Sequence, residues 1–442
     1  MQSKQFYHFV IPSILSSLVT GLYFVVDGIF VGRGVGTQAL ASINIAVPFI
    51  SLLTSVSMMI AIGGGTLAAI CFGRGENARA NGIFRQSMVL MLFFAGLMTM
   101  ISVIFPSQLA RMLGASEALL SMTADYLKFY VLFGVFFCGA MVLAAFVRND
   151  GNPRLASTGM IVGALSNVVL DWLFIFPMQM GVVGAAVASG LGQVLSCAVL
   201  ATHFLGHRGD LRIGRVALRG RDLLAIMRTG TPEFVNQMSQ PVTILCYNYL
   251  VIAMLGEIGV AAFSVISYLL VIIVAVFIGL AEGMQPLLSR SFGAGDARSE
   301  RIILRKGLRL GVALAVAAYA LMWGFGRQII GIFNSDPTMI AIAYDCIKIY
   351  GLCFIFAAAN IVYTINFLAT QRTAQALVIA SLRSFVCNVL FILVMPQLFG
   401  EGALWTGMIA CEAVVLMVAI ALTRRQEALR SMPALGHRAL GD

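Results

Sequence analysis

Long unbroken runs of apolar residues follow one another along the chain, separated by short stretches in which charged residues, glycine and proline collect. Each run holds about 20–30 residues, which is the length of α-helix that crosses a bilayer. Strands of a membrane barrel would instead alternate apolar and polar residues over about 10 positions. The pattern therefore predicts twelve transmembrane helices, over residues 6–31, 39–72, 86–107, 120–147, 155–178, 181–205, 230–254, 260–290, 302–325, 340–367, 376–398 and 401–423.

The composition agrees with an integral membrane protein. Of the 442 residues, 60% are hydrophobic and only 11% are charged, and the mean hydropathy is +0.94. Soluble domains carry about 25% charged residues because water must wet their surfaces, so lipid must solvate most of this exterior. The first apolar run is longer than the core of a signal peptide and is interpreted as the first transmembrane helix. The eight cysteines form no CxxC pair and lie in or beside apolar segments, so we expect neither disulfides nor metal ligands.

Basic residues fall mainly in the loops on one side of the predicted bundle. With the N-terminus inside, 24 of the 29 Lys and Arg residues lie in the inner loops and tails, a set in which Arg383 is counted. Such a bias predicts that both termini are cytoplasmic. It also accounts for the net charge of +10 without a nucleic-acid partner, because basic loops meet the anionic lipid of the inner leaflet.

The two halves of the chain resemble each other at a shift of 220 residues. Matching positions are Pro12 and Pro232, Gly36 and Gly256, Gly63 and Gly283, and the turns at residues 72–75 and 292–295. Six helices repeated in one orientation predict an all-α membrane protein of two six-helix bundles, here called the first and second lobes, related by a pseudo-twofold axis along the membrane normal. The expected divisions are the first lobe at residues 1–206, a basic cytoplasmic linker at 207–229, the second lobe at 230–425 and a cytoplasmic tail at 426–442. Repeats of this kind are typical of alternating-access transporters, with a substrate site between the lobes.

Few polar residues remain inside the predicted helices, and those of the first lobe lie at similar depths. Asp27 follows Tyr23 by four residues in the first helix, and Asp171 follows Asn167 by four residues in the fifth, so each pair shares a helix face. Counting from the start of the sixth helix places Ser189 level with Asp171. We expect these five residues to meet in the outer half of the first lobe.

Such a cluster suits a small cation. Two carboxylates in apolar surroundings can retain a proton near neutral pH, or bind Na⁺ through their oxygens. A polar cluster that only stabilises the helices is one alternative, and an Asp27 solvated at the end of its helix is another. The second lobe carries Tyr247 at the position of Asp27. After a slippage of one residue in the repeat, Asn388 corresponds to Asn167 and Ile392 to Asp171, so cation coupling is expected in the first lobe only.

The polar residues of the second lobe are candidates to contact a substrate. Glu282 is the strongest of them for a cationic substrate, although it could equally be the ion-pair partner of Arg290. Glu412 is a weaker candidate of the same kind. The predicted substrate-binding set is Glu282, Asn236, Gln240 and Asn360.

Several short segments carry a resemblance to a known family. They are Pro12 and Asp27 in the first helix, residues 31–33 and 39–41, Pro48, the Phe-Gly-Arg-Gly turn at 72–75, the Arg-Asn-Asp-Gly-Asn-Pro-Arg segment at 148–154, Gln285-Pro286, and the Phe-Gly-Ala-Gly turn at 292–295. With twelve helices and a six-helix repeat, the sequence resembles the multidrug and toxic compound extrusion (MATE) transporters of the bacterial branch, over nearly the whole chain.

The resemblance implies a transporter that exports organic cations in exchange for H⁺ or Na⁺. In family members whose cation site is in the first lobe, the ligands are an Asp on helix 1, an Asn and an Asp on helix 5, and a hydroxyl residue on helix 6. These correspond here to Asp27, Asn167, Asp171 and Ser189, which would also hold the metal ion if the cation is Na⁺. Other members use acidic residues on helices 7 and 10, where this chain offers amides. The resemblance also implies that Pro12 lets the first helix bend when Asp27 is protonated.

We therefore expect a secondary transporter and no enzyme: a proton- or sodium-coupled antiporter that exports amphipathic, mostly cationic small molecules across a bacterial cytoplasmic (inner) membrane. It should need no cofactor beyond the coupling ion, contact membrane lipid and be a monomer. A flippase for lipid-linked oligosaccharide from the same superfamily is the alternative, although the acidic residues inside the membrane disfavour it. A membrane enzyme is disfavoured too, because no histidine lies at membrane depth beside a nucleophile.

Overall fold

The computed structural model describes residues 3–431, apart from residue 216 and residues 333–335. All regular elements in this part of the chain are helices. The first lobe contains α1 (Ser3–Gly34), α2 (Thr37–Gly73), α3 (Asn77–Ile104), α4 (Pro106–Met112), α5 (Glu117–Leu132), α6 (Gly134–Asn149), α7 (Pro153–Ile175) and α8 (Gly181–Leu205). The second lobe contains α9 (Gly220–Gly293), α10 (Ala297–Gly331), α11 (Pro337–Tyr350), α12 (Cys353–Ala369), α13 (Thr373–Ser381), the π-helical turn η1 (Leu382–Val386), α14 (Cys387–Phe399), the 3-10 turn η2 (Glu401–Thr406) and α15 (Gly407–Ser431).

The helices account for all twelve predicted spans. Within the described residues, nine helices are long and apolar enough to cross a membrane, and two bent pairs, α5 with α6 and α11 with α12, raise the number to eleven. The remaining predicted span, residues 230–254, lies in the first part of α9, which is helical up to a break at Gly256. The helix starts differ in places, since α9 begins at Gly220, ten residues earlier than predicted. The prediction of an all-α membrane protein is confirmed.

The repeat is also visible in the backbone. Gly36 and Gly256 both have positive φ angles, of 115° and 66°, and separate the first two helices of their lobes. Gly75 and Gly295 follow the second helix of each lobe with φ angles of 75° and 71°. Because side chains with a Cβ rarely adopt this conformation, glycine at these positions specifies the same turns in both lobes.

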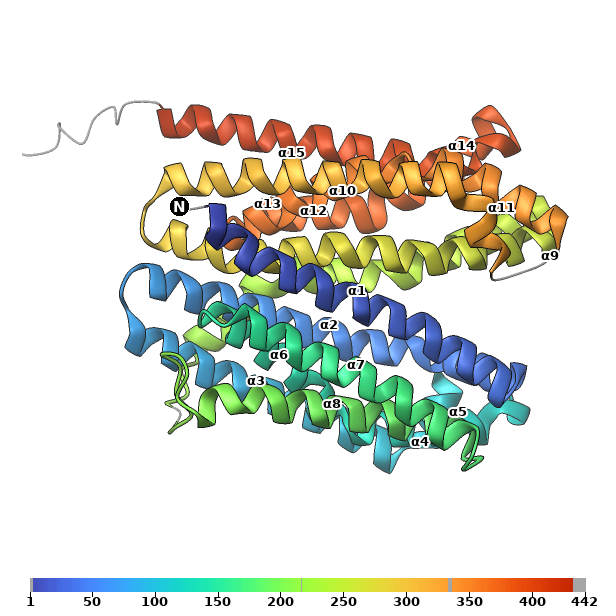
Figure 1. The fold of residues 1–442 in the computed structure, drawn as a ribbon, viewed down its shortest axis with the longest axis horizontal. Coiled ribbons are helices and arrows are strands. Elements are labelled where there is room, and N and C mark those ends of the chain that lie inside the picture. The colour runs from blue at the N-terminus through green and yellow to red at the C-terminus, as the bar shows by residue number, and fades with distance from the viewer. Residues whose placement is uncertain (1–2, 216, 333–335, 432–442) are drawn as a thin grey trace, which may run out of the picture.

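The lobes lie side by side, with α1 running obliquely between them (Figure 1). The buried apolar side chains form two clusters, one from the first lobe and one from the second. The second cluster also takes in Phe6, Phe9 and Val10 of α1 and Ile62 of α2. The helices α1, α2 and α9 therefore form the interface between the lobes.

Glycines bring this interface into backbone contact at two repeat-related places. A Cβ at Gly63 of α2 would lie 2.9 Å from the backbone nitrogen of Gly230 in α9. A Cβ at Gly283 of α9 would lie 2.7 Å from Cα of Val10 in α1. Both distances are shorter than real Cβ atoms allow, so only glycine fits. A third contact, between Gly73 of α2 and residues 290–294, lies at the end of the molecule that also carries the loop at residues 206–219 (Figure 1). We call this end the linker end.

Candidate functional site

A buried polar cluster lies where α1, α7 and α8 meet. The amide of Asn167 donates a hydrogen bond to the hydroxyl of Ser189, with 3.1 Å between nitrogen and oxygen. The carboxyl groups of Asp27 and Asp171 are close enough to share a proton, and Asn167 is a further neighbour of Asp171. The structure therefore brings together the four side chains that the sequence assigns to one cation site.

Small residues set this geometry. A Cβ at Gly192 of α8 would lie 2.8 Å from the carbonyl oxygen of Gly163 and 3.1 Å from Cβ of Asn167. The helices α7 and α8 thus touch backbone to backbone within one turn of Asn167, and this contact places Ser189 within hydrogen-bond distance. Gly34 of α1 packs against the side chain of Ile175 of α7, so α1 and α7 also lie close together near their two carboxylates.

Several oxygens of the cluster lack a hydrogen-bond donor. Asp171 and Asn167 are fully buried, whereas Asp27 and Ser189 are partly exposed. Within the described part of the chain, no donor reaches Oδ1 of Asp27, Oδ1 of Asn167 or either carboxylate oxygen of Asp171. Buried acceptors without donors are unfavourable, and an oxygen-only set is what a proton or a hard cation requires. The residues present thus fit H⁺ or Na⁺.

Three tyrosines surround the two carboxylates. Tyr23 of α1 interacts electrostatically with both Asp27 and Asp171, as predicted from its position one turn before Asp27. Tyr126 and Tyr130 of α5 are also neighbours of the carboxylates, and their rings lie 5.5 Å apart. The sequence analysis missed Tyr126 and Tyr130. Their spacing of four residues, on one face of an otherwise apolar helix, is the signal that could have identified them.

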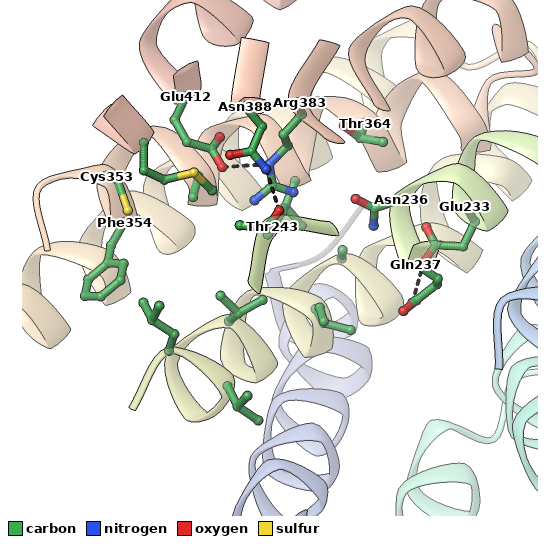
Figure 2. Close-up of a pocket in the computed structure, with 18 of the residues that line it drawn as sticks. Glu233, Asn236, Gln237, Thr243, Cys353, Phe354, Thr364, Arg383, Asn388 and Glu412 are labelled. Atoms are coloured by element: carbon green, nitrogen blue, oxygen red, sulfur yellow. Dashed lines mark hydrogen bonds and ion pairs between the residues drawn. The ribbon is translucent and has the colours of Figure 1, made fainter. Parts of the chain in front are cut away.

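The second lobe contains a cavity of about 230 Å³ that faces α2 of the first lobe (Figure 2). Aromatic rings line part of its wall, among them Tyr247, Phe263 and Phe354. Aliphatic side chains line much of the rest, and charged and polar side chains complete it, among them Glu233, Asn236, Gln237, Thr243, Glu282, Arg383, Asn388 and Glu412. The cavity is therefore amphipathic, as expected of a site for amphipathic molecules.

The predicted substrate-binding residues are distributed unevenly around this cavity. Asn236 and Glu282 line it, whereas Asn360 donates a hydrogen bond of 2.7 Å to the carboxylate of Glu412. Gln240 belongs to α9, but its side chain lies outside the described part of the structure. Glu233 also lines the cavity and was not predicted.

The placement of Arg383 corrects the sequence analysis. Arg383 was counted among the basic residues of the inner loops, but it belongs to the π-helical turn η1 and lines the cavity. It lies ten residues after the start of α13 at Thr373, which is about 15 Å along the helix. Its Nε donates to Oε1 of Glu412 at 2.7 Å. A π-helical turn often marks a functional position in a membrane helix.

Glu282 pairs across the interface between the lobes. Its carboxylate lies 2.9 Å from a terminal nitrogen of Arg148, the last basic residue of α6. The expected alternative partner, Arg290, instead donates to the backbone carbonyl of Asn149. The amide of Asn149 in turn donates to Gln285 of α9 at 3.0 Å. A polar layer thus joins the two lobes towards the linker end.

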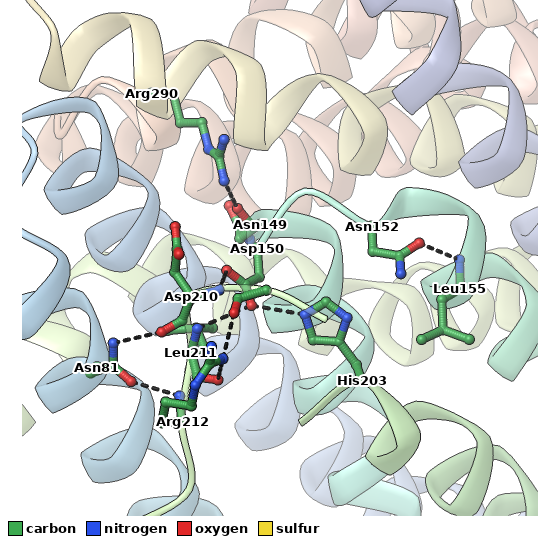
Figure 3. Close-up of polar contacts among 11 residues, drawn as sticks. Asn81, Asn149, Asp150, Asn152, Leu155, His203, Asp210, Leu211, Arg212 and Arg290 are labelled. Carbon is green, nitrogen blue, oxygen red and sulfur yellow. Dashed lines mark hydrogen bonds and ion pairs between the residues drawn. The ribbon is translucent and has the colours of Figure 1, made fainter. Parts of the chain in front are cut away.

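The loop at residues 206–219 is fastened to the first lobe (Figure 3). The carboxylate of Asp150 lies 2.8 Å from Nε2 of His203, and both side chains are buried. The same carboxylate accepts hydrogen bonds from the backbone N–H groups of Asp210 and Leu211. Asn81 of α3 binds the loop a second time, through the backbone of Asp210 and of Arg212.

Two repeated helical lobes, an oxygen-lined cluster in one and an amphipathic cavity in the other define the class: a multi-pass membrane transporter and not an enzyme. The MatE family model matches residues 12–173 and again residues 232–394, once in each lobe. The chain belongs to the MatE family.

Curated relatives and solved structures agree with this assignment. The multidrug export protein MepA of Staphylococcus saprophyticus is 26% identical over 429 residues, covering 96% of this chain and 94% of the relative. MepA of Staphylococcus aureus is 24% identical over the same length, with the same coverage. A MATE crystal structure in complex with MaL6 superposes with a TM-score of 0.92 at 20% identity, covering 97% of each chain. A MOP superfamily transporter from Pyrococcus furiosus superposes with a TM-score of 0.90 at 21% identity, again over 97% of each chain. These structures show the same fold.

Proposed function

We propose that this multidrug efflux transporter is an antiporter that exports amphipathic, mostly cationic organic compounds in exchange for H⁺ or Na⁺. The observation that carries the proposal is the set of buried oxygens without donors on Asp27, Asn167 and Asp171. Buried acceptors are usually paired within the protein, so unpaired oxygens on three neighbouring side chains support a site that an ion occupies. The relatives named multidrug export proteins support the export of organic compounds.

The ion enters the first-lobe cluster through Asp27. Asp27 is the partly exposed carboxylate and Asp171 the fully buried one, so an arriving H⁺ or Na⁺ meets Asp27 first and is then shared with Asp171. Ser189 and Asn167 complete the oxygen set. Pro12 lies inside α1, which is helical throughout Ser3–Gly34, and removes one of the hydrogen bonds that would stiffen it. Occupation of Asp27 therefore changes the bend of α1 at Pro12, and α1 packs against both lobes.

The substrate occupies the cavity of the second lobe. Its aromatic and aliphatic wall accommodates the apolar body of the substrate, and Glu233, Asn236 and Glu282 provide polar contacts for a cationic group. The cavity borders α2, so motion between the lobes changes its access. The lobes at residues 1–206 and 230–425 move as two bodies joined by the linker, and one monomer contains the complete pathway.

The linker end faces the cytoplasm of a bacterium, because the basic loops collect there. The start of α1 and the end of α15 lie at that end (Figure 1), so both termini are expected on the cytoplasmic side. The contacts of Gly63, Gly73 and Glu282 hold the lobes together towards it. This arrangement suits a state that opens to the outside. A lipid-linked oligosaccharide flippase would require a mainly cationic cavity, whereas the described lining here holds three carboxylates and one arginine.

Purified protein in liposomes tests the proposal. We expect an imposed proton or sodium gradient to drive uptake of a fluorescent organic cation, and one of the two gradients to be sufficient by itself. Substituting both Asp27→Asn and Asp171→Asn should abolish the response to either gradient. The exposed carboxylate Asp125, changed to Asn, provides the matched control. Uptake that persists at the original rate in the double variant would show that the first-lobe cluster does not couple transport.

A further inference from the structure

Arg383 brings a full positive charge into a cavity at membrane depth. Charged groups at this depth are unfavourable and usually face a partner or a functional cavity. Glu412, which is fully buried, accepts from Nε of Arg383 through Oε1 and from Asn360 through Oε2. The three side chains come from η1, α15 and α12, so three elements fix the orientation of one guanidinium group.

This arrangement leaves most of the guanidinium available to a ligand. A guanidinium has five N–H donors, and the two terminal nitrogens carry four of them. Neither terminal nitrogen of Arg383 makes a hydrogen bond to a described residue, and the side chain keeps 17% of its surface exposed within the lining of the cavity. An arginine needed only to neutralise Glu412 would pair with it through two parallel hydrogen bonds, which is the favoured geometry. Here the second oxygen of Glu412 is occupied by Asn360 instead.

The opposite charge lies on another part of the wall. Figure 2 shows Glu233, Asn236 and Gln237 together, across the cavity from Arg383 and Glu412. Gln237 donates to the carboxylate of Glu233 at 2.8 Å. Glu233 interacts electrostatically with Arg383, and among the described residues no Lys, Arg or His forms an ion pair with it.

The geometry points to a carboxylate-binding subsite at Arg383, so that the cavity selects zwitterionic amphipathic compounds as well as simple cations. The carboxylate of the compound accepts hydrogen bonds from the terminal nitrogens of Arg383. Its cationic group lies towards Glu233, and its aromatic body contacts rings such as Tyr247 and Phe354. The inference rests on the proposed function and specifies the substrate class of the same cavity.

A matched pair of probes isolates the contribution of the carboxylate. Rhodamine B carries a delocalised cation and a free carboxylate, and its ethyl ester keeps the cation but loses the negative charge. In liposomes, we expect the protein to transport both probes. In a variant without the guanidinium of Arg383, the carboxylate of rhodamine B loses its charge-assisted hydrogen bonds, and transport and binding of this probe should fall by about tenfold. The ester should change by no more than about twofold.

The main variant removes the charges of Arg383 and Glu412 together, so that the net charge of the cavity lining does not change. Arg383→Gln alone would leave Glu412 buried without a cation, so the test uses Arg383→Gln combined with Glu412→Gln. Glu412→Gln alone retains the guanidinium and should still distinguish rhodamine B from its ester. Arg383→Lys retains the charge but not the planar fork, and should lose part of the rhodamine B affinity. Arg309→Gln, on an exposed position of α10, is the control.

The outcomes separate the subsite from the proposed function. The subsite is supported if the double variant loses transport and binding of rhodamine B but retains those of the ester. If the double variant reduces transport and binding of both probes equally, or of neither, Arg383 does not bind the carboxylate. Wild-type protein that transports the ester but not rhodamine B overturns the subsite and leaves cation export intact. Wild-type protein that transports neither probe under any gradient overturns the proposed function as well. Binding in detergent can also be measured directly by the fluorescence anisotropy of each probe. The assignment is supported if Arg383→Lys already lowers the affinity for rhodamine B but not the affinity for the ester.

Discussion

The two lobes share a scaffold but differ at the positions where the first lobe carries its polar cluster. In the second lobe, Asn388 corresponds to Asn167 of the first lobe. The amide of Asn388 donates a hydrogen bond to the hydroxyl of Thr243, which stands at the position of Tyr23. The amide is thus retained in both lobes, but its hydrogen-bond partner differs: Ser189 for Asn167 and Thr243 for Asn388. The carboxylates are not retained, because Tyr247 stands in place of Asp27.

The replacement changes the chemistry of the region. Tyr247 is fully buried, and its ring stacks with that of Phe263 at a centroid distance of 5.0 Å. Trp405 lies parallel to the same tyrosine, with 9° between the ring planes. Ile392, at the position of Asp171, is fully buried as well. The same scaffold thus supports a buried cluster with two carboxylates in one lobe and an aromatic wall in the other, so duplicated helices need not carry the same side-chain chemistry.

The largest effect should come from moving the charge between the lobes. Asp27→Tyr combined with Tyr247→Asp keeps the composition but places a carboxylate among aromatic rings, where no second acid lies at position 392. We expect gradient-driven transport to fall to the level of protein-free liposomes. Uptake of a fluorescent cation under separate proton and sodium gradients measures it. Restored coupling in this swapped variant would show that the lobes are interchangeable, contrary to the comparison.

The next effect concerns the repeat-related glycine contacts. Gly63→Val and Gly283→Val each place side-chain atoms where the partner helix already lies. Overpacking of this kind costs about 1–3 kcal/mol, so both variants should unfold at lower temperature in detergent. Their effects should be of similar size, because the contacts are related by the repeat. Gly82→Ala, where nothing lies within 4 Å of the new Cβ, is the control. A loss confined to one of the two would argue that the interface is not symmetric.

An effect of similar size is expected at the ion pair that has no counterpart in the repeat. Arg148 and Glu282 lie 2.9 Å apart across the lobe interface, while the position equivalent to Glu282 in the first lobe is Ile62. Removing one partner of such a pair costs roughly 2–3 kcal/mol. Arg148→Glu with Glu282→Arg should recover part of the loss seen in each single variant. Thermal unfolding of the four proteins gives the coupling energy, and additive losses would mean that the pair contributes nothing.

The smallest effect should distinguish the two retained amides. Asn388→Ala removes a bond to Thr243 and should cost about 1 kcal/mol of stability without altering the cation dependence of transport. Asn167→Ala should have a similar cost in stability but also raise the ion concentration at half-maximal transport. Measuring transport against ion concentration for both variants separates the roles. Identical ion dependences would remove Asn167 from the coupling site.

Much of the architecture follows from local sequence, whereas the inter-lobe contacts do not. Helix length and apolar runs predict the spans, and depth along a helix predicts that Asp27 and Asp171 meet. Arg383 falls inside the predicted helix at residues 376–398, but its place near the start of that helix grouped it with the basic residues of the inner loops. Its partner Glu412 lies 29 residues further along the chain, so local sequence does not show the pairing. The pairing of Arg148 with Glu282 spans 134 residues and requires the packing of both lobes. No periodicity within one helix contains that information.

The fastened loop between the lobes has a consequence for how far they can separate. Beyond the contacts of Asp150, Gln86 of α3 accepts a hydrogen bond from the backbone of Arg219 and donates one to Asp222 of α9. The loop at residues 206–219 is therefore held against the first lobe, although its fourteen residues could span about 45 Å if they were released and fully extended. Any rocking that lifts the start of α9 from α3 must break these bonds first. If the lobes move as proposed, these hydrogen bonds would therefore limit how far the start of α9 can separate from α3.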